Sequence, residues 1–182
     1  MLFVDGENVT KRAQETAKKA GIVLAEGAYY KPEVFVWFRG WSGRDVVFQP
    51  PNSLRLQRFA MRAYFYTSVI GSEQDRNQVH ERLQALDFSP LVLHRDKNGR
   101  NKGVDISLTK DMLGHAHRDH YDVAVLASGD GDYEPVVQEV KRLGKIVYVF
   151  AFKSGLNEKL ARAADGSYEL DDLIRDFDRV KP

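Results

Sequence analysis

Short apolar segments recur along this sequence, and their alternation with helix-like stretches constrains the fold more than any other feature. The apolar segments are residues 2–4, 63–66, 91–93, 123–127 and 146–150. A strand that is buried on both faces reads as an unbroken apolar run, because neither face meets water. Stretches between these runs carry apolar residues at helical spacing, for example Val79, Leu83 and Leu86. We therefore expect an α/β fold in which helices cover both faces of a mainly parallel sheet.

The length of 182 residues suits one domain, and neither a repeat nor a linker divides the chain. One segment departs from the alternation of strands and helices, because seven of the 20 aromatic residues lie between Tyr29 and Phe48. We expect a single domain over residues 1–182 with an aromatic-rich insertion at about residues 26–50, which forms a β-hairpin or a loop.

The composition limits the chemistry that this chain can perform. It has no cysteine, which excludes disulfides, thiolate zinc sites and cysteine nucleophiles, so a metal ion would need oxygen or imidazole ligands. The net charge of +1 does not by itself indicate a polyanionic partner. No apolar run approaches the ~18 residues of a membrane span, and the first residues lack the features of a signal peptide. We therefore expect a cytoplasmic protein without a membrane partner.

Acidic residues follow two of the expected strands at the point where each strand ends. Asp5 follows the first apolar run, and Asp130 and Asp132 follow the fourth. Ligands of doubly wound sheets bind beyond the carboxyl ends of the strands, so these side chains are candidates for a site. A helix is expected from about residue 101 to 116, and its Asp105 can face the same crevice if this helix flanks the centre of the sheet.

Such a cluster of carboxylates requires a positive partner. Two carboxylates 4 Å apart repel one another by roughly 4 kcal/mol at an effective dielectric constant near 20. Mg²⁺ or Mn²⁺ would balance this charge, and two such ions can position a water and stabilise a phosphodiester displacement. A structural role stays open for Asp130 or Asp132, either of which can cap the following helix. Glu7 and Asp111 are expected to be surface groups.

Three blocks of the sequence resemble the signature motifs of one family. They are residues 3–8 (FVDGEN), 102–105 (KGVD) and 128–133 (SGDGDY), in that order. Together they resemble the NYN domain, the LabA-like branch of the PIN-like metal-dependent ribonucleases. The resemblance implies a three-layer α/β/α, Rossmann-like fold. It also implies a Mg²⁺ or Mn²⁺ site that cleaves RNA, with internal cleavage as the expected mode.

The resemblance further implies roles for single residues. Carried over position by position, the catalytic residues that hold metal directly or through water are Asp5, Asp105, Asp130 and Asp132. In the same way, Asn8 would orient phosphate or water in the first helical turn, Ser128 would help to shape the metal pocket, and Lys102 would meet a phosphate. The aromatic segment is not part of these motifs, and it leaves the choice of substrate open.

The sequence also indicates where RNA would approach. The loop before the helix of Asp105 is basic, and its Lys97 and Arg100 lie where a backbone entering the crevice would pass, so single-stranded RNA is the expected partner. The aromatic segment suits base stacking, a packed hairpin or a contact between two copies of the chain, so a homodimer is one of the assemblies left open.

Two other functions stay open at this point. One is an RNA-binding or partner-binding module that keeps the fold but cleaves slowly or not at all. The other is a haloacid-dehalogenase-like phosphatase, in which Asp5 would be a covalent nucleophile and Glu7 the general acid. That class expects Asp rather than Glu at the second position, and it does not require Asp105.

Overall fold

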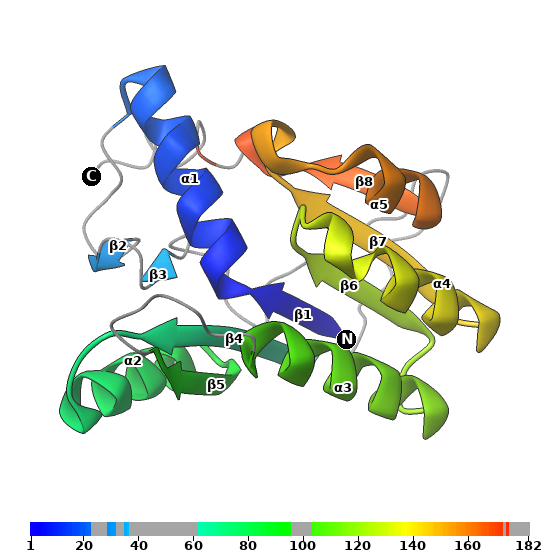
Figure 1. Cartoon of the computed structure of the whole chain (residues 1–182), viewed down its shortest axis with the longest axis horizontal. Coiled ribbons are helices and arrows are strands. Elements are labelled where there is room, and N and C mark those ends of the chain that lie inside the picture. The colour runs from blue at the N-terminus through cyan, green and yellow to red at the C-terminus, as the bar shows by residue number, and fades with distance from the viewer. Residues whose placement is uncertain (23–28, 32–34, 37–61, 96–102, 173, 175–182) are drawn as a thin grey trace.

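The structure, a computed structural model, describes residues 1–22, 29–31, 35–36, 62–95, 103–172 and 174. In this part of the chain, six parallel strands form one sheet in the order β5-β4-β1-β6-β7-β8 (Figure 1). Their bounds are β1 Leu2–Asp5, β4 Ala63–Val69, β5 Ser89–His94, β6 Val123–Ala127, β7 Ile146–Ala151 and β8 Gly166–Glu169. Each predicted apolar run lies within one of the first five of these strands. The predicted α/β fold with a mainly parallel sheet is confirmed.

Helices cover both faces of the sheet. The α-helices of the described residues are α1 Gly6–Ala20, α2 Glu73–Ala85, α3 Gly103–His117, α4 Glu134–Arg142 and α5 Glu158–Ala163. Alternate residues of a strand point to opposite faces, and Leu2 and Val4 join a core cluster with α1 and α2, whereas Phe3 joins another with α3, α4 and α5. The described part is therefore a three-layer α/β/α structure. None of these helices is long and apolar enough to span a bilayer.

The predicted aromatic insertion falls between α1 and β4. Two short strands of it are described, β2 Tyr29–Lys31 and β3 Phe35–Val36, and they pair antiparallel. Strand β3 lies against α1 (Figure 1). This pairing agrees with a β-hairpin at the start of the segment, while residues 37–50 lie outside the described residues.

The strand order places a crevice at the centre of the sheet. From β1 the chain passes to β4 and β5 on one side, and then to β6, β7 and β8 on the other (Figure 1). In doubly wound sheets, ligands bind outside the carboxyl ends of the strands at the point where the order reverses. Strands β1 and β6 are neighbours there, with Val4 beside Ala127, so Asp5 and residues 128–132 converge on one edge of the sheet.

The start of α1 packs tightly against β4. A Cβ atom at Gly6 would lie 2.1 Å from Cε1 of Phe65 and 2.9 Å from the backbone oxygen of Tyr66. Only glycine permits this approach, which places the first turn of α1 directly beside the middle of β4.

Candidate active site

Asp5 is both the last residue of β1 and the N-cap of α1. Its Oδ1 atom accepts a hydrogen bond from the backbone N–H of Asn8, 3.1 Å away, which satisfies one of the free donors of the first helical turn. Its Oδ2 atom accepts a hydrogen bond from Oγ of Ser128 at 2.9 Å. The residue is only 3% exposed. Both carboxylate oxygens are therefore held in place where two strand ends meet.

A closed ring of hydrogen bonds ties the end of β1 to the turn after β6. The ring continues from Asn8, whose Oδ1 atom accepts from the backbone N–H of Gly129 at 3.2 Å. Ser128 is fully buried, and its Oγ atom also accepts from the backbone N–H of Asp130 at 3.2 Å. The structure thus brings together Asp5, Asn8 and Ser128, three residues that the sequence analysis placed in one site.

Gly129 is required in this turn. A Cβ atom there would lie 2.2 Å from the backbone oxygen of Gly155, in the 3₁₀ turn that follows β7. The approach is too close for any side chain, so the turn after β6 packs directly on backbone.

Burial makes the charge of Asp5 unfavourable. Loss of hydration is the largest cause that raises its pKa, from 3.8 to about 7, and the nearby carboxylates of Asp105 and Glu7 raise it further. The hydrogen bonds from Asn8 and Ser128 act in the opposite direction, because they stabilise the carboxylate. A cation at this place would favour the ionised form.

Asp105 reaches the crevice from the first turn of α3, as the sequence predicted. Its Oδ1 atom accepts a hydrogen bond of 3.1 Å from the hydroxyl of Tyr133. Partial burial raises the pKa of Asp105, the bond from Tyr133 lowers it, and neighbouring carboxylates raise it again. Burial and these carboxylates also raise the pKa of the Tyr133 phenol, which therefore stays a hydrogen-bond donor.

Tyr133 is a site residue to which the sequence analysis gave no role. It is the last residue of the third motif, and it is 2% exposed. Its place in the motif was a signal, but its side chain meets Asp105 only because α3 and the turn after β6 lie side by side.

Asp130 and Asp132 are exposed at the mouth of the same region. Asp130 caps a short 3₁₀ helix, Gly131–Tyr133, by accepting from the backbone N–H of Asp132 at 3.0 Å. Asp130 therefore has a structural role, but it caps this short turn rather than α4, which has no side-chain cap. Both carboxylates still lie close enough to raise the pKa of Asp105, so capping does not remove Asp130 from the site.

Two carboxylates expected at the surface are partly exposed, with 28% of the Glu7 side chain and 34% of the Asp111 side chain accessible, and both also have partners. Glu7 forms an ion pair with Arg95 and accepts a hydrogen bond from Ser68, whose Oγ atom also accepts from Nε of Arg95 at 3.0 Å. Asp111 accepts a hydrogen bond of 3.0 Å from the hydroxyl of the buried Tyr66. In both cases the partner comes from a strand that is distant in sequence.

The side chains at this edge match a hard divalent cation in kind. They offer carboxylate oxygens, which Mg²⁺ and Mn²⁺ prefer, and loss of hydration together with neighbouring carboxylates raises the pKa of Asp5 and of Asp105. Among the residues that the structure describes, however, no three His, Asp or Glu side chains stand close enough together to hold one ion. Water would have to complete the coordination of an ion bound here, which is usual for Mg²⁺.

The predicted RNA-contacting residues Lys97, Arg100 and Lys102 lie outside the described residues. Arg95, at the start of the same basic loop, is described, and it points to Glu7 rather than to solvent. Its side chain is 18% exposed.

The chain is similar to known proteins along most of its length. A family model described as "NYN domain" matches residues 1–171. The Low amplitude and bright protein LabA of Synechococcus elongatus is 27% identical over 126 residues, which cover 64% of this chain and 66%, just under two thirds, of that protein. A crystal structure of a protein of unknown function from Vibrio parahaemolyticus matches with a TM-score of 0.57 and 21% identity, covering 94% of this chain and 92% of that one. At that identity the likeness supports the fold alone.

Proposed function

Because the chain belongs to the NYN domain family of PIN-like nucleases, we propose that it is a ribonuclease whose cleavage of RNA depends on Mg²⁺ or Mn²⁺. The observation that carries this proposal is Asp5. This carboxylate is almost fully buried, yet it is fixed through both oxygens at the point where the strand order reverses. The carboxylates of Asp105 and Glu7 stand near it, and Glu7 is paired with Arg95.

We assign the metal ligands, direct or through water, to Asp5, Asp105, Asp130 and Asp132. A bound divalent cation supplies a water activated for attack on the phosphodiester and positive charge for the transition state. The remaining residues act as positioning groups. Ser128 and Asn8 hold Asp5 and the turn after β6, and Tyr133 holds Asp105.

Single-stranded RNA is the proposed substrate, with internal cleavage as its mode and Lys97, Arg100 and Lys102 as phosphate contacts. An open, single strand can enter a crevice at the edge of a sheet without being unwound. Circular single-stranded RNA tests the mode, because it has no ends. Cleavage of the circle is expected, whereas a circle that stays intact while linear RNA is degraded would contradict internal cleavage.

Manganese-dependent cleavage of labelled RNA by Asp105→Asn tests the site. The asparagine oxygen can still accept from Tyr133, so the fold should persist while the charge is lost. We expect a loss of at least about a hundredfold in rate, since a neutral amide binds divalent cations poorly. Glu81→Gln, which removes an exposed carboxylate from α2, is the matched control and should cleave normally. Wild-type cleavage by Asp105→Asn would refute the assignment.

A second candidate function is an RNA-binding module with little or no cleavage. The observation in its favour is that the described residues contain no ready-made set of three metal ligands. This candidate predicts RNA binding without cleavage at any Mn²⁺ concentration, so the same assay separates the two.

The phosphatase alternative is no longer supported. The family match is to the NYN domain. In addition, Glu7 would have to act as the general acid of that reaction, but its carboxylate is held by Arg95 and Ser68.

A further inference from the structure

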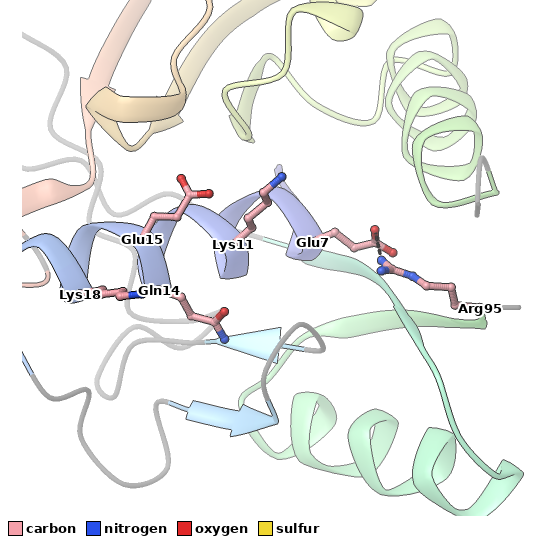
Figure 2. A pocket seen from close by; sticks show the side chains of 6 residues that line it. All are labelled: Glu7, Lys11, Gln14, Glu15, Lys18 and Arg95. Carbon is pink, nitrogen blue, oxygen red and sulfur yellow. Dashed lines mark ion pairs between the residues drawn. The ribbon is translucent and has the colours of Figure 1, made fainter. Parts of the chain in front are cut away.

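A groove lined by long charged and polar side chains runs along α1, away from the crevice. It has a volume of about 510 Å³ and is lined by Glu7, Lys11, Gln14, Glu15, Lys18 and Arg95 (Figure 2). Figure 2 shows the other side chains spread along α1 and Arg95 reaching toward Glu7 from the end of β5. The Glu7 end of the groove lies beside the candidate active site, because Glu7 follows Asp5 by two residues. We call this feature the α1 groove.

The carboxylates of the α1 groove are already compensated. Glu7 pairs with Arg95, and Oε2 of Glu15 lies 2.9 Å from a guanidinium nitrogen of Arg12. Neither carboxylate therefore repels an anion with its full charge.

The two lysines of the groove are not compensated in this way. Lys11 and Lys18 are exposed, and neither forms an ion pair with the described residues. Seven residues separate them, so they share one face of α1 and lie about 10 Å apart along its axis. Gln14 lies between them and adds an uncharged polar side chain. The groove thus presents two lysines, with Glu15 between them along the helix, and this face leads away from the crevice.

We propose that the α1 groove binds the sugar-phosphate backbone of single-stranded RNA and guides it to the crevice. This inference rests on the proposed function and names the path of its substrate. Lysine contacts to phosphates give affinity without reading sequence. None of the described side chains that line the groove is aromatic, so they offer no platform for base stacking. The described lining of the groove therefore fits a backbone rather than bases.

Equilibrium binding of fluorescent single-stranded RNA to Lys11→Glu/Lys18→Glu tests the inference. The measurement uses the whole chain in chelator, so that no RNA is cut, and repeats it over a series of salt concentrations. Each phosphate contact on a single strand contributes about −0.7 to the slope of log K against log salt. We expect the double reversal to weaken binding at least about tenfold and to flatten the slope by about 1.4.

Lys19→Glu/Lys110→Glu is the matched control. It makes the same change in net charge at exposed lysines that do not line the groove. We expect its salt slope to equal that of the wild type. Equal losses in both double variants, or an unchanged slope in Lys11→Glu/Lys18→Glu, would overturn the inference. Polyglutamate that binds as tightly as RNA would also overturn it, because the groove would then take any polyanion.

The proposed function is judged separately, from Mn²⁺-dependent cleavage by the wild-type chain. If the wild type cleaves RNA but the groove variants bind RNA normally, the proposed RNA path is refuted and the ribonuclease proposal stands. If the groove variants bind RNA more weakly but the wild type does not cleave it, the ribonuclease proposal is refuted and the proposed RNA path stands.

Discussion

Replacing Asp5 by asparagine should stabilise this protein at alkaline pH, although it removes a central site residue. Asparagine is a good N-cap, and its oxygen can still accept from the backbone N–H of Asn8. What the substitution removes is a negative charge that is buried beside Asp105 and Glu7.

The magnitude follows from the pKa of Asp5. The folded chain raises this pKa from 3.8 to about 7, so it binds the proton more tightly than the unfolded chain does. The contribution of this group to the free energy of unfolding is therefore greatest below pH 3.8, falls as the pH rises to about 7, and stays low above that. A difference of one in pKa corresponds to about 1.4 kcal/mol, so the ionised carboxylate costs about 4 kcal/mol at pH 8.

The variant avoids this cost but loses the hydrogen bond from Ser128, which is worth about 1 kcal/mol. We therefore expect Asp5→Asn to raise the free energy of unfolding by about 3 kcal/mol at pH 8. At pH 4.5 the gain should nearly vanish, to within about 1 kcal/mol, because Asp5 of the wild type is then mostly protonated in the folded chain.

Urea unfolding in chelator at both pH values measures this difference. Glu81→Gln is the control, because Glu81 is exposed on α2 and its neutralisation should add nothing at either pH. If Asp5→Asn raised the free energy of unfolding equally at pH 4.5 and pH 8, or lowered it at pH 8, the buried charge would not be what destabilises this site.

Three further outcomes follow from the same geometry. Mn²⁺ should raise the melting temperature of the wild type, and at a hundredfold excess over Kd the stabilisation is about 2.7 kcal/mol. The rise in melting temperature should be smaller in Asp130→Asn. A rise as large as that of the wild type would place the ion elsewhere. Ser128→Ala should lower the free energy of unfolding, measured with urea, by about 1–3 kcal/mol, because Asp5 and the N–H of Asp130 both lose a buried partner. The control, Ser89→Ala at an exposed position, should change this free energy little. Tyr133→Phe should raise the pKa of Asp105 further and shift the pH profile of RNA cleavage upward, and an unmoved profile would mean that this hydroxyl does not position Asp105.

The strands at the centre of the sheet were predictable, because their faces are all buried. Residues 123–127, for example, form β6 between β1 and β7, with helices on both faces. Strand β8 was not predicted. It lies at the edge, its residues alternate between half-buried and exposed, and Gly166–Glu169 holds a single aromatic residue. Because β8 has little apolar content, unlike β5 at the other edge, its periodicity does not reveal it.

The polar partners of the site were less predictable than its carboxylates. Asp5, Asp105 and Asp130 follow local patterns, a strand end or a helix start, that can be read within a few residues. The groups that hold Glu7 and Asp111 come from strand β4 and from the end of β5. Ser68, which donates to Glu7, is 61 residues away from it, and Tyr66, which donates to Asp111, is 45 residues away. No local pattern specifies such a pair, because it depends on which strands become neighbours.

The Glu7–Arg95 pair shows what this dependence on strand order implies for function. Arg95 follows β5, two strands away from β1, and its backbone N–H is bound to the carbonyl of Val69 at the end of β4. Its guanidinium can therefore reach the first turn of α1 only because β4 lies between β5 and β1. This single cation stands where the α1 groove meets the carboxylates around Asp5. Because Glu7 neutralises this cation, an RNA backbone that passes Lys11 would next meet the carboxylates around Asp5, so its phosphates would need a metal ion to advance beyond the groove.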